Sequence, residues 1–174
     1  MGNQKTADAW PQTTAEWFKK GVLAFKKPDG VAAVKAFQKV ISLDPGYRQP
    51  DGDNAFFYLG KIMEVEGDLK QAVAMYTKAL SLDCWDEESL IGRGSCYTVL
   101  NQPDNAIADF KKVLSIGSSR RAPVEQIYYA IGENYRKQGK WPLAWEWGKK
   151  AQAEDPKSDR IKKLVDDATA WLEG

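Results

Sequence analysis

Four stretches of the chain repeat one spacing of small and aromatic residues. After Gly60, the residues Ala72, Tyr76 and Cys84 follow 12, 16 and 24 positions later. The same intervals recur at Gly21, Ala33, Phe37 and Pro45, at Gly94, Ala106, Phe110 and Ser118, and at Gly132, Ala144, Gly148 and Pro156. Self-similarity at a period of about 20 to 50 residues is typical of chains that stack one small unit several times. The copies cover about residues 14–47, 53–86, 87–120 and 125–158, and the insertions fall between them.

Each copy is predicted to be a hairpin of two amphipathic helices. The first helix ends near "KKPDG", "EGDLK", "LNQPDN" or "QGKWP", where Gly, Pro, Asp and Asn interrupt the helical pattern. Two helices that cross at short distance need small side chains at the crossing point. Gly60 and Ala72 meet that need in the second copy, so the small positions mark close contacts.

The two ends of the array have their own signals. Residues 159–173 are predicted to form a helix that covers the last hairpin, because stacked units leave an apolar face open at the end. Its apolar stripe consists of Ile161, Leu164, Val165, Ala168 and Leu172. We expect it to pack on the second helix of the fourth copy, where Trp145 and Trp147 fill the space left by Gly148. Thr13 and Glu16 form a predicted capping box, which makes residues 1–13 a flexible tail and residues 14–174 one domain.

The spacing resembles that of the tetratricopeptide repeat (TPR) family. The resemblance includes the aromatic-x-x-Leu-Gly opening in "FFYLG", the later Ala and aromatic residue, and the closing Pro. It implies an all-α fold, a right-handed α-solenoid of four TPR helical hairpins with a C-terminal capping helix. The chain departs from the family pattern at Cys84 and Ser118, where Pro is usual, at Ala24, where a large side chain is usual, and at Gly148, where an aromatic is usual.

Composition disfavours several classes of function. The 25 basic and 24 acidic residues give a net charge of +1, so no overall positive field attracts nucleic acid or an anionic bilayer. No apolar run approaches the roughly 18 residues that a membrane span requires, and the polar first residues do not resemble a signal sequence. We therefore expect no stable membrane insertion and a cytoplasmic location, or a periplasmic one if a signal sequence has been removed.

The sequence offers no catalytic constellation. It contains no histidine, no phosphate-binding glycine loop and no paired thiol motif, and its two cysteines, Cys84 and Cys96, are expected to be ordinary thiols. Neighbouring acidic residues such as Asp86 and Glu87 diverge around a helix, which favours a solvated face over a metal site. We expect a chain that is not an enzyme and that carries no cofactor or metal.

The resemblance implies a binding groove lined by the first helix of each hairpin, where family members hold extended or helical peptides. The positions that would face this groove are Phe18, Val22 and Phe25 in the first copy; Asn54, Phe57, Lys61 and Glu64 in the second; Glu88, Ile91, Ser95 and Thr98 in the third; and Gln126, Tyr129, Glu133 and Arg136 in the fourth. One row, Phe18, Phe57, Ile91 and Tyr129, is apolar throughout. An exposed apolar row favours a partner with an apolar or aromatic segment, unless neighbouring helices or the N-terminal tail cover it.

Several functional readings stay open at this stage. The Lys, Arg and Asn set with which chaperone-binding relatives clamp a terminal carboxylate is missing, because Phe18, Val22, Tyr58, Glu88 and Gly92 stand in its place. The apolar row is more similar to relatives that shield a client, so an adaptor or a client-shielding chaperone is expected. The alternative is a scaffold that self-associates through its end or its convex surface. Trp10 could enter the groove, and Gly2 with Thr6 fits a short myristoylation pattern.

Overall fold

The computed structural model describes residues 13–27, 29–117 and 120–174, and its regular elements are all helices. The tail positions Gly2, Thr6 and Trp10 lie outside the described residues. The helices are α1 (Thr14–Lys26), α2 (Gly30–Leu43), α3 (Ala55–Val65), α4 (Leu69–Leu82), α5 (Glu87–Val99), α6 (Pro103–Ser115), α7 (Val124–Lys137), α8 (Trp141–Glu154) and α9 (Asp159–Glu173).

Local sequence explains where the helices begin. The side chain of Thr13 accepts a hydrogen bond from the backbone N–H of Glu16, and the backbone N–H of Thr13 donates one to the Glu16 carboxylate. These two bonds confirm the capping box. Asp29 and Asp68 cap the second helices of the first two hairpins through their side chains, whereas α6 and α8 carry Pro in their first turn. Proline is tolerated there, because the N–H groups of the first turn have no hydrogen-bond partner within the helix.

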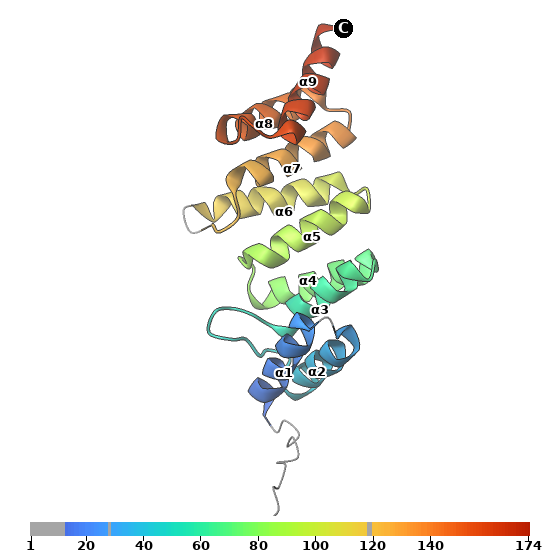
Figure 1. The fold of residues 1–174 in the computed structure, drawn as a ribbon, viewed down its shortest axis with the longest axis vertical. Helices are drawn as coiled ribbons and strands as arrows, with labels where there is room; N and C mark the ends of the chain where they lie inside the picture. The colour runs from blue at the N-terminus through green and yellow to red at the C-terminus, as the bar shows by residue number, and fades with distance from the viewer. Residues whose placement is uncertain (1–12, 28, 118–119) are drawn as a thin grey trace, which may run out of the picture.

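The helices form four antiparallel hairpins stacked along one axis. Figure 1 shows α1 and α2 at one end of the elongated molecule and α9 at the other, with the hairpins in chain order between them. Each hairpin packs on the next, and α3 also packs beside α5, as does α7 beside α9. The predicted all-α repeat fold is therefore confirmed, and the first helices of neighbouring hairpins share one side of the stack.

Small residues lie where the two helices of a hairpin cross. The four alanines of the repeat, Ala33, Ala72, Ala106 and Ala144, have no exposed surface. A Cβ atom added to Gly21 would lie 2.7 Å from the ring of Phe37, and one added to Gly60 would lie 2.8 Å from the ring of Tyr76. Real Cβ atoms do not approach other atoms this closely, so the aromatic rings occupy the space that the glycines leave.

The fourth hairpin fills its space differently from our expectation. A Cβ atom on Gly148 would lie 3.0 Å from Cγ2 of Val165, and one on Gly132 would lie 2.8 Å from Cδ2 of Leu164. Helix α9 thus supplies the bulk that an aromatic residue supplies in the other three hairpins. The expectation that Trp145 and Trp147 fill the space beside Gly148 is wrong.

Helix α9 covers the end of the stack with four of its five predicted stripe residues. Ile161, Leu164, Val165 and Ala168 are buried, but Leu172 is 47% exposed. The helices α8 and α9 run antiparallel, and the ring of Trp171 stacks on that of Trp141 at the start of α8, with ring centroids 6.3 Å apart. Leu172 follows Trp171, at the point where α8 has no further turn to cover it, which explains why this prediction is wrong.

Candidate binding groove

The first candidate site is a hollow of about 330 Å³ between α3 and α5, which we call the central hollow. It is lined by Phe57, Lys61, Glu64, Tyr76, Glu88, Ile91, Gly92 and Ser95. Six of these are positions that the sequence assigned to the groove, and the structure brings them together. Tyr76 and Gly92 were not assigned to it, because Tyr76 comes from the second helix of its hairpin and Gly92 has no side chain to point anywhere.

Tyr76 shapes the floor of the central hollow. Its ring lies between Gly60 on α3 and Gly92 on α5. A Cβ atom added to Gly60 would lie 2.8 Å from a ring atom, and one added to Gly92 would lie 2.5 Å from one. The hydroxyl of Tyr76 donates a hydrogen bond of 2.6 Å to Oε2 of Glu64. Burial and this bond raise the pKa of Tyr76 well above its usual value. The bond holds the Glu64 carboxylate in place at the rim.

The predicted apolar row is only partly available to a ligand. Phe18 is 3% exposed and Phe57 is 5% exposed. The ring of Phe18 packs within 6 Å, centroid to centroid, of Phe37, Tyr47 and Tyr58. Neighbouring side chains therefore cover the first half of the row, which corrects the expectation of a continuous apolar surface. Ile91 and Tyr129 remain half-buried.

Other predicted groove positions have structural partners. Asn54 is fully buried and caps α3, accepting a 3.0 Å hydrogen bond from the N–H of Phe57, so its assignment to the groove is wrong. Val22 and Phe25 pack against the core of the first two hairpins. Thr98 accepts a 2.9 Å hydrogen bond from Nδ2 of Asn134, which joins α5 to α7. Gln126 is exposed.

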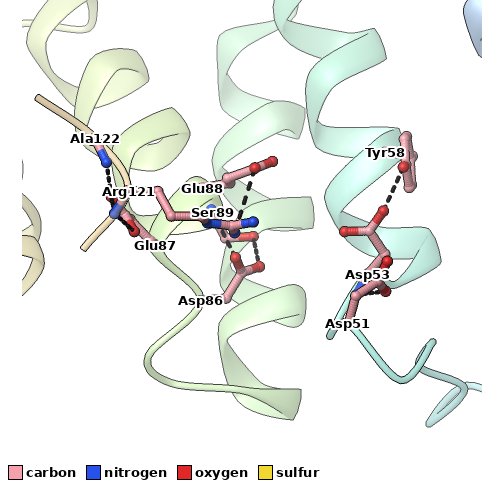
Figure 2. A network of polar contacts seen from close by, with 9 residues as sticks. All are labelled: Asp51, Asp53, Tyr58, Asp86, Glu87, Glu88, Ser89, Arg121 and Ala122. Carbon is pink, nitrogen blue, oxygen red and sulfur yellow. Dashed lines mark hydrogen bonds and ion pairs between the residues drawn. The ribbon is translucent and has the colours of Figure 1, made fainter. Parts of the chain in front are cut away.

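A second hollow, the acidic hollow, opens beside the central one and shares Phe57 and Glu88 with it. Its carboxylates come from Asp51, Asp53, Asp83, Asp86, Glu87 and Glu88, and among the residues that the structure describes Arg121 is its one cation. Figure 2 shows Asp51 and Asp53 on one side and the acidic start of α5 on the other, with Arg121 reaching Glu88. Glu87 accepts hydrogen bonds from the N–H groups of Arg121 and Ala122, which fastens the loop after α6.

The negative field of the acidic hollow acts on a nearby hydroxyl. Tyr58 donates a 2.6 Å hydrogen bond to Oδ2 of Asp53. Burial, this bond and the carboxylates of Asp53, Glu88 and Asp51 raise the pKa of Tyr58. Helical periodicity did not indicate this hollow, because four of its six carboxylates, Asp51, Asp53, Asp83 and Asp86, lie outside the helices. The clustered acidic residues of "DGD" and "DEE" were the available signal.

A third hollow, the C-terminal hollow, lies between α7 and α9 and measures about 210 Å³. It contains the predicted positions Tyr129, Glu133 and Arg136, together with Arg160, Lys163, Leu164 and Asp167 of α9. The sequence predicted α9 as a cover for the core, and its contribution to the groove was missed. Within the stack, α9 lies beside α7 as α5 lies beside α3.

The described part of the chain has neither a metal-binding cluster nor a membrane-spanning helix. No group of three or more Cys, Asp and Glu side chains there has an arrangement that could hold a metal ion. No helix among the described residues is both long and apolar enough to span a membrane. Cys84 is exposed and Cys96 is buried, and both are free thiols, as expected.

These features define a helical-repeat protein with a groove along its first helices, and comparison with known proteins names the family. The sequence profile of the tetratricopeptide repeat matches residues 87–116, which form the third hairpin. The third hairpin therefore has the sequence of a tetratricopeptide repeat, and it lies in a stack of four hairpins of the same fold.

Solved structures share this fold at low sequence identity. A crystal structure of MamA protein aligns with a TM-score of 0.74 at 22% identity, over 92% of this chain and 88% of that one. YrrB, described as a TPR protein with an unusual peptide-binding site, aligns with a TM-score of 0.79 at 16% identity, over 92% and 78% of the two chains. The first TPR of Spaghetti (RPAP3), bound to the HSP90 peptide SRMEEVD, aligns with a TM-score of 0.62 at 17% identity, over 68% and 91%.

One similar protein of known activity is an enzyme. The UDP-N-acetylglucosamine-peptide N-acetylglucosaminyltransferase of Giardia intestinalis is 27% identical over 100 residues. That match covers 58% of this chain but only 6% of the enzyme. The chain thus corresponds to a small part of that protein.

Proposed function

We propose that this chain is a non-catalytic protein-interaction module that binds a segment of a partner protein in the central hollow. The observation that carries the proposal is the hollow itself, which is preformed between two packed helices and combines an apolar floor with a charged rim. Ligand sites in proteins commonly combine apolar walls with a few placed polar groups. Two proteins that share the fold support this proposal: YrrB is described as having an unusual peptide-binding site, and the Spaghetti domain is bound to an HSP90 peptide.

The partner segment presents one or two apolar side chains flanked by polar ones. Half-buried Ile91 offers the main apolar contact, and the buried rings of Phe57 and Tyr76 lie beneath it as the floor. Lys61 lies at the rim with its Nζ 5.5 Å from the ring centroid of Phe57, and Glu64 and Glu88 add negative charge. A long apolar segment fits less well than the sequence suggested, because Phe18 and Phe57 are largely covered.

The proposed role is that of an adaptor or a client-shielding chaperone in the cytoplasm.

Self-association through the C-terminal end is a second candidate function. Trp145, Trp171 and Leu172 are 38%, 54% and 47% exposed, and all lie on α8 or α9. Clustered exposed apolar side chains of this kind often mark contact surfaces. A second copy of the chain docked there would make the molecule a scaffold instead of a monomeric adaptor.

Affinity capture from cells of the source organism tests the first function. The variants are Ile91→Asp and Ser95→Arg, which alter the central hollow from two positions of α5. The matched control is Val31→Asp, which places the same charge on α2 at a residue that is 84% exposed. Circular dichroism and thermal melting first establish that each variant folds.

We expect both groove variants to lower partner recovery about tenfold, as loss of a central contact residue does in other interfaces. The control should retain the partner. Full recovery by both groove variants would contradict binding in the central hollow. Light scattering over a range of concentrations tests the second function, which requires a mass increase that Trp171→Ser abolishes.

A further inference from the structure

The C-terminal hollow carries a charge pattern unlike the rest of the groove. Its cations are Arg136, Arg160 and Lys163, and its anions are Glu133 and Asp167, so it has one surplus positive charge. The acidic hollow, by contrast, holds six carboxylates and one guanidinium. The sign of the charge therefore differs between the acidic hollow near α3 and α5 and the C-terminal hollow near α9.

One of the two anions of the C-terminal hollow, Glu133, pairs directly with Arg136. The Nε and Nη2 atoms of Arg136 donate to the two carboxylate oxygens of Glu133 at 3.1 Å and 2.8 Å. The hydrogen bond to Glu133, with smaller effects from Glu133 and Asp167 as charges, raises the pKa of Arg136. Arg136 is thus already neutralised within the protein.

Arg160 and Lys163 form no ion pair with any described residue. Arg160 is held by a different contact, because its guanidinium lies 5.4 Å from the ring centroid of Tyr129. Stacking on an aromatic ring orients a guanidinium while leaving its N–H groups free to donate. The hollow therefore presents an oriented fork of donors beside a lysine, with Tyr129 and Leu164 as apolar walls.

We propose that the C-terminal hollow binds the side-chain carboxylate of an acidic residue in the partner segment. This inference rests on the proposed function and adds the chemistry that one end of the segment must have. A guanidinium fork matches the two oxygens of a carboxylate, and the apolar walls match the methylene groups of a glutamate. One surplus positive charge matches one carboxylate.

The proposal also gives the partner an orientation. An acidic residue placed between α7 and α9 is attracted there and repelled by the acidic hollow near α3 and α5. The segment therefore lies with its acidic residue toward α9. The reverse orientation would set like charges against each other.

Three tetrapeptides test the proposal by ¹H–¹⁵N NMR titration of the full chain at low salt. The first is acetyl-Leu-Glu-Ser-Leu-amide, and the second replaces its Glu by Gln. The third is the Gln peptide with a free terminal carboxylate in place of the amide. The protein variants are the double substitution Arg160→Gln with Lys163→Gln, and the control Lys162→Gln, whose lysine pairs with Asp166 and does not line the hollow.

We expect the Glu peptide to bind about fivefold more tightly than either Gln peptide, the size of effect typical of a partly exposed ion pair. Its shifts should centre on Tyr129, Arg160 and Lys163. The advantage should vanish in the double variant, persist in Lys162→Gln and shrink with added salt.

Three results would overturn the proposal: equal binding of the Glu and Gln peptides, no binding at millimolar concentration, or an advantage that survives the double variant. If the free-terminus peptide binds as tightly as the Glu peptide, the hollow does not prefer a side-chain carboxylate to a terminal one, and the proposal is refuted. The proposed function fails separately, when partner capture survives both Ile91→Asp and Ser95→Arg.

Discussion

Tyr76 lies between two glycines, and this arrangement shows why particular residues in the repeat stay small. Gly60 and Gly92 come from α3 and α5, and the ring of Tyr76 from α4 fills the space beside both. A glycine inside a helix costs about 0.5 to 1 kcal/mol relative to alanine. Close packing of a fully buried tyrosine offsets that cost here.

Substitution of Gly60 by alanine tests this packing. The added Cβ would lie 2.8 Å from two ring atoms of Tyr76, which cannot move away without leaving its bond to Glu64. We expect the free energy of unfolding, measured by urea denaturation, to fall by about 1 to 3 kcal/mol. In the control Gly30→Ala the nearest atom is a flexible Glu66 oxygen at 3.7 Å, so stability should stay equal or rise. Equal losses in both variants would contradict the close contact.

The hydroxyl of Tyr76 should make stability depend on pH. Burial and the bond to Glu64 raise its pKa in the folded state above the unfolded value of about 10. The folded state then keeps a proton that the unfolded state loses, so the stabilisation is present below pH 10 and is lost as pH rises. We expect the advantage of the native protein over Tyr76→Phe to shrink above about pH 10, by at most about 1.4 kcal/mol per pH unit. Urea denaturation of both proteins at pH 8 and pH 11 measures this difference in the free energy of unfolding. The same difference at both pH values would refute a raised pKa of Tyr76.

At the scale of elements, α9 has two roles in one helix. One face supplies Leu164 and Val165, which occupy the space beside Gly132 and Gly148 that aromatic rings fill in earlier hairpins. Another part supplies Arg160 and Lys163 to the C-terminal hollow. The helix thus completes both the core and the groove of the fourth hairpin.

Truncation of the buried leucine should show the structural role. Leu164 is 1% exposed, so Leu164→Ala leaves a cavity beside two glycines, and we expect a loss of about 2 to 5 kcal/mol in the free energy of unfolding. Leu172→Ala, at a residue that is 47% exposed on the same helix, should cost less than about 1 kcal/mol. Urea denaturation compares the two directly. Similar losses would mean that the stripe extends to Leu172, as the sequence first suggested.

At the scale of the whole molecule, the sequence predicts the stacking well and the surface poorly. The interval from Gly60 to Ala72 to Tyr76 requires two helices in close contact, and its four copies require a stack, because each hairpin has an open apolar face. These constraints are local and repeat, which is why the fold could be predicted.

The surface depends on contacts between distant segments, and single positions do not reveal them. Phe18 has the spacing of a groove residue, but Tyr47 from the loop between α2 and α3 and Tyr58 from the next hairpin cover it. The acidic hollow likewise combines Asp53 from one loop with Glu88 from another hairpin. No helical periodicity relates such residues, so these features became visible only in three dimensions.

The position at which a partner contacts the molecule tests most directly whether the partner binds in the central hollow. A photo-crosslinking phenylalanine analogue is placed at Ser95, which lines the central hollow, or at Ala108, which is exposed on α6 of the same hairpin. Each protein is irradiated in an extract of the source organism, and the adducts are identified by mass spectrometry. The account predicts partner adducts from position 95 and few from position 108. Adducts from position 108 alone, or equally from both, would contradict a binding site in the groove.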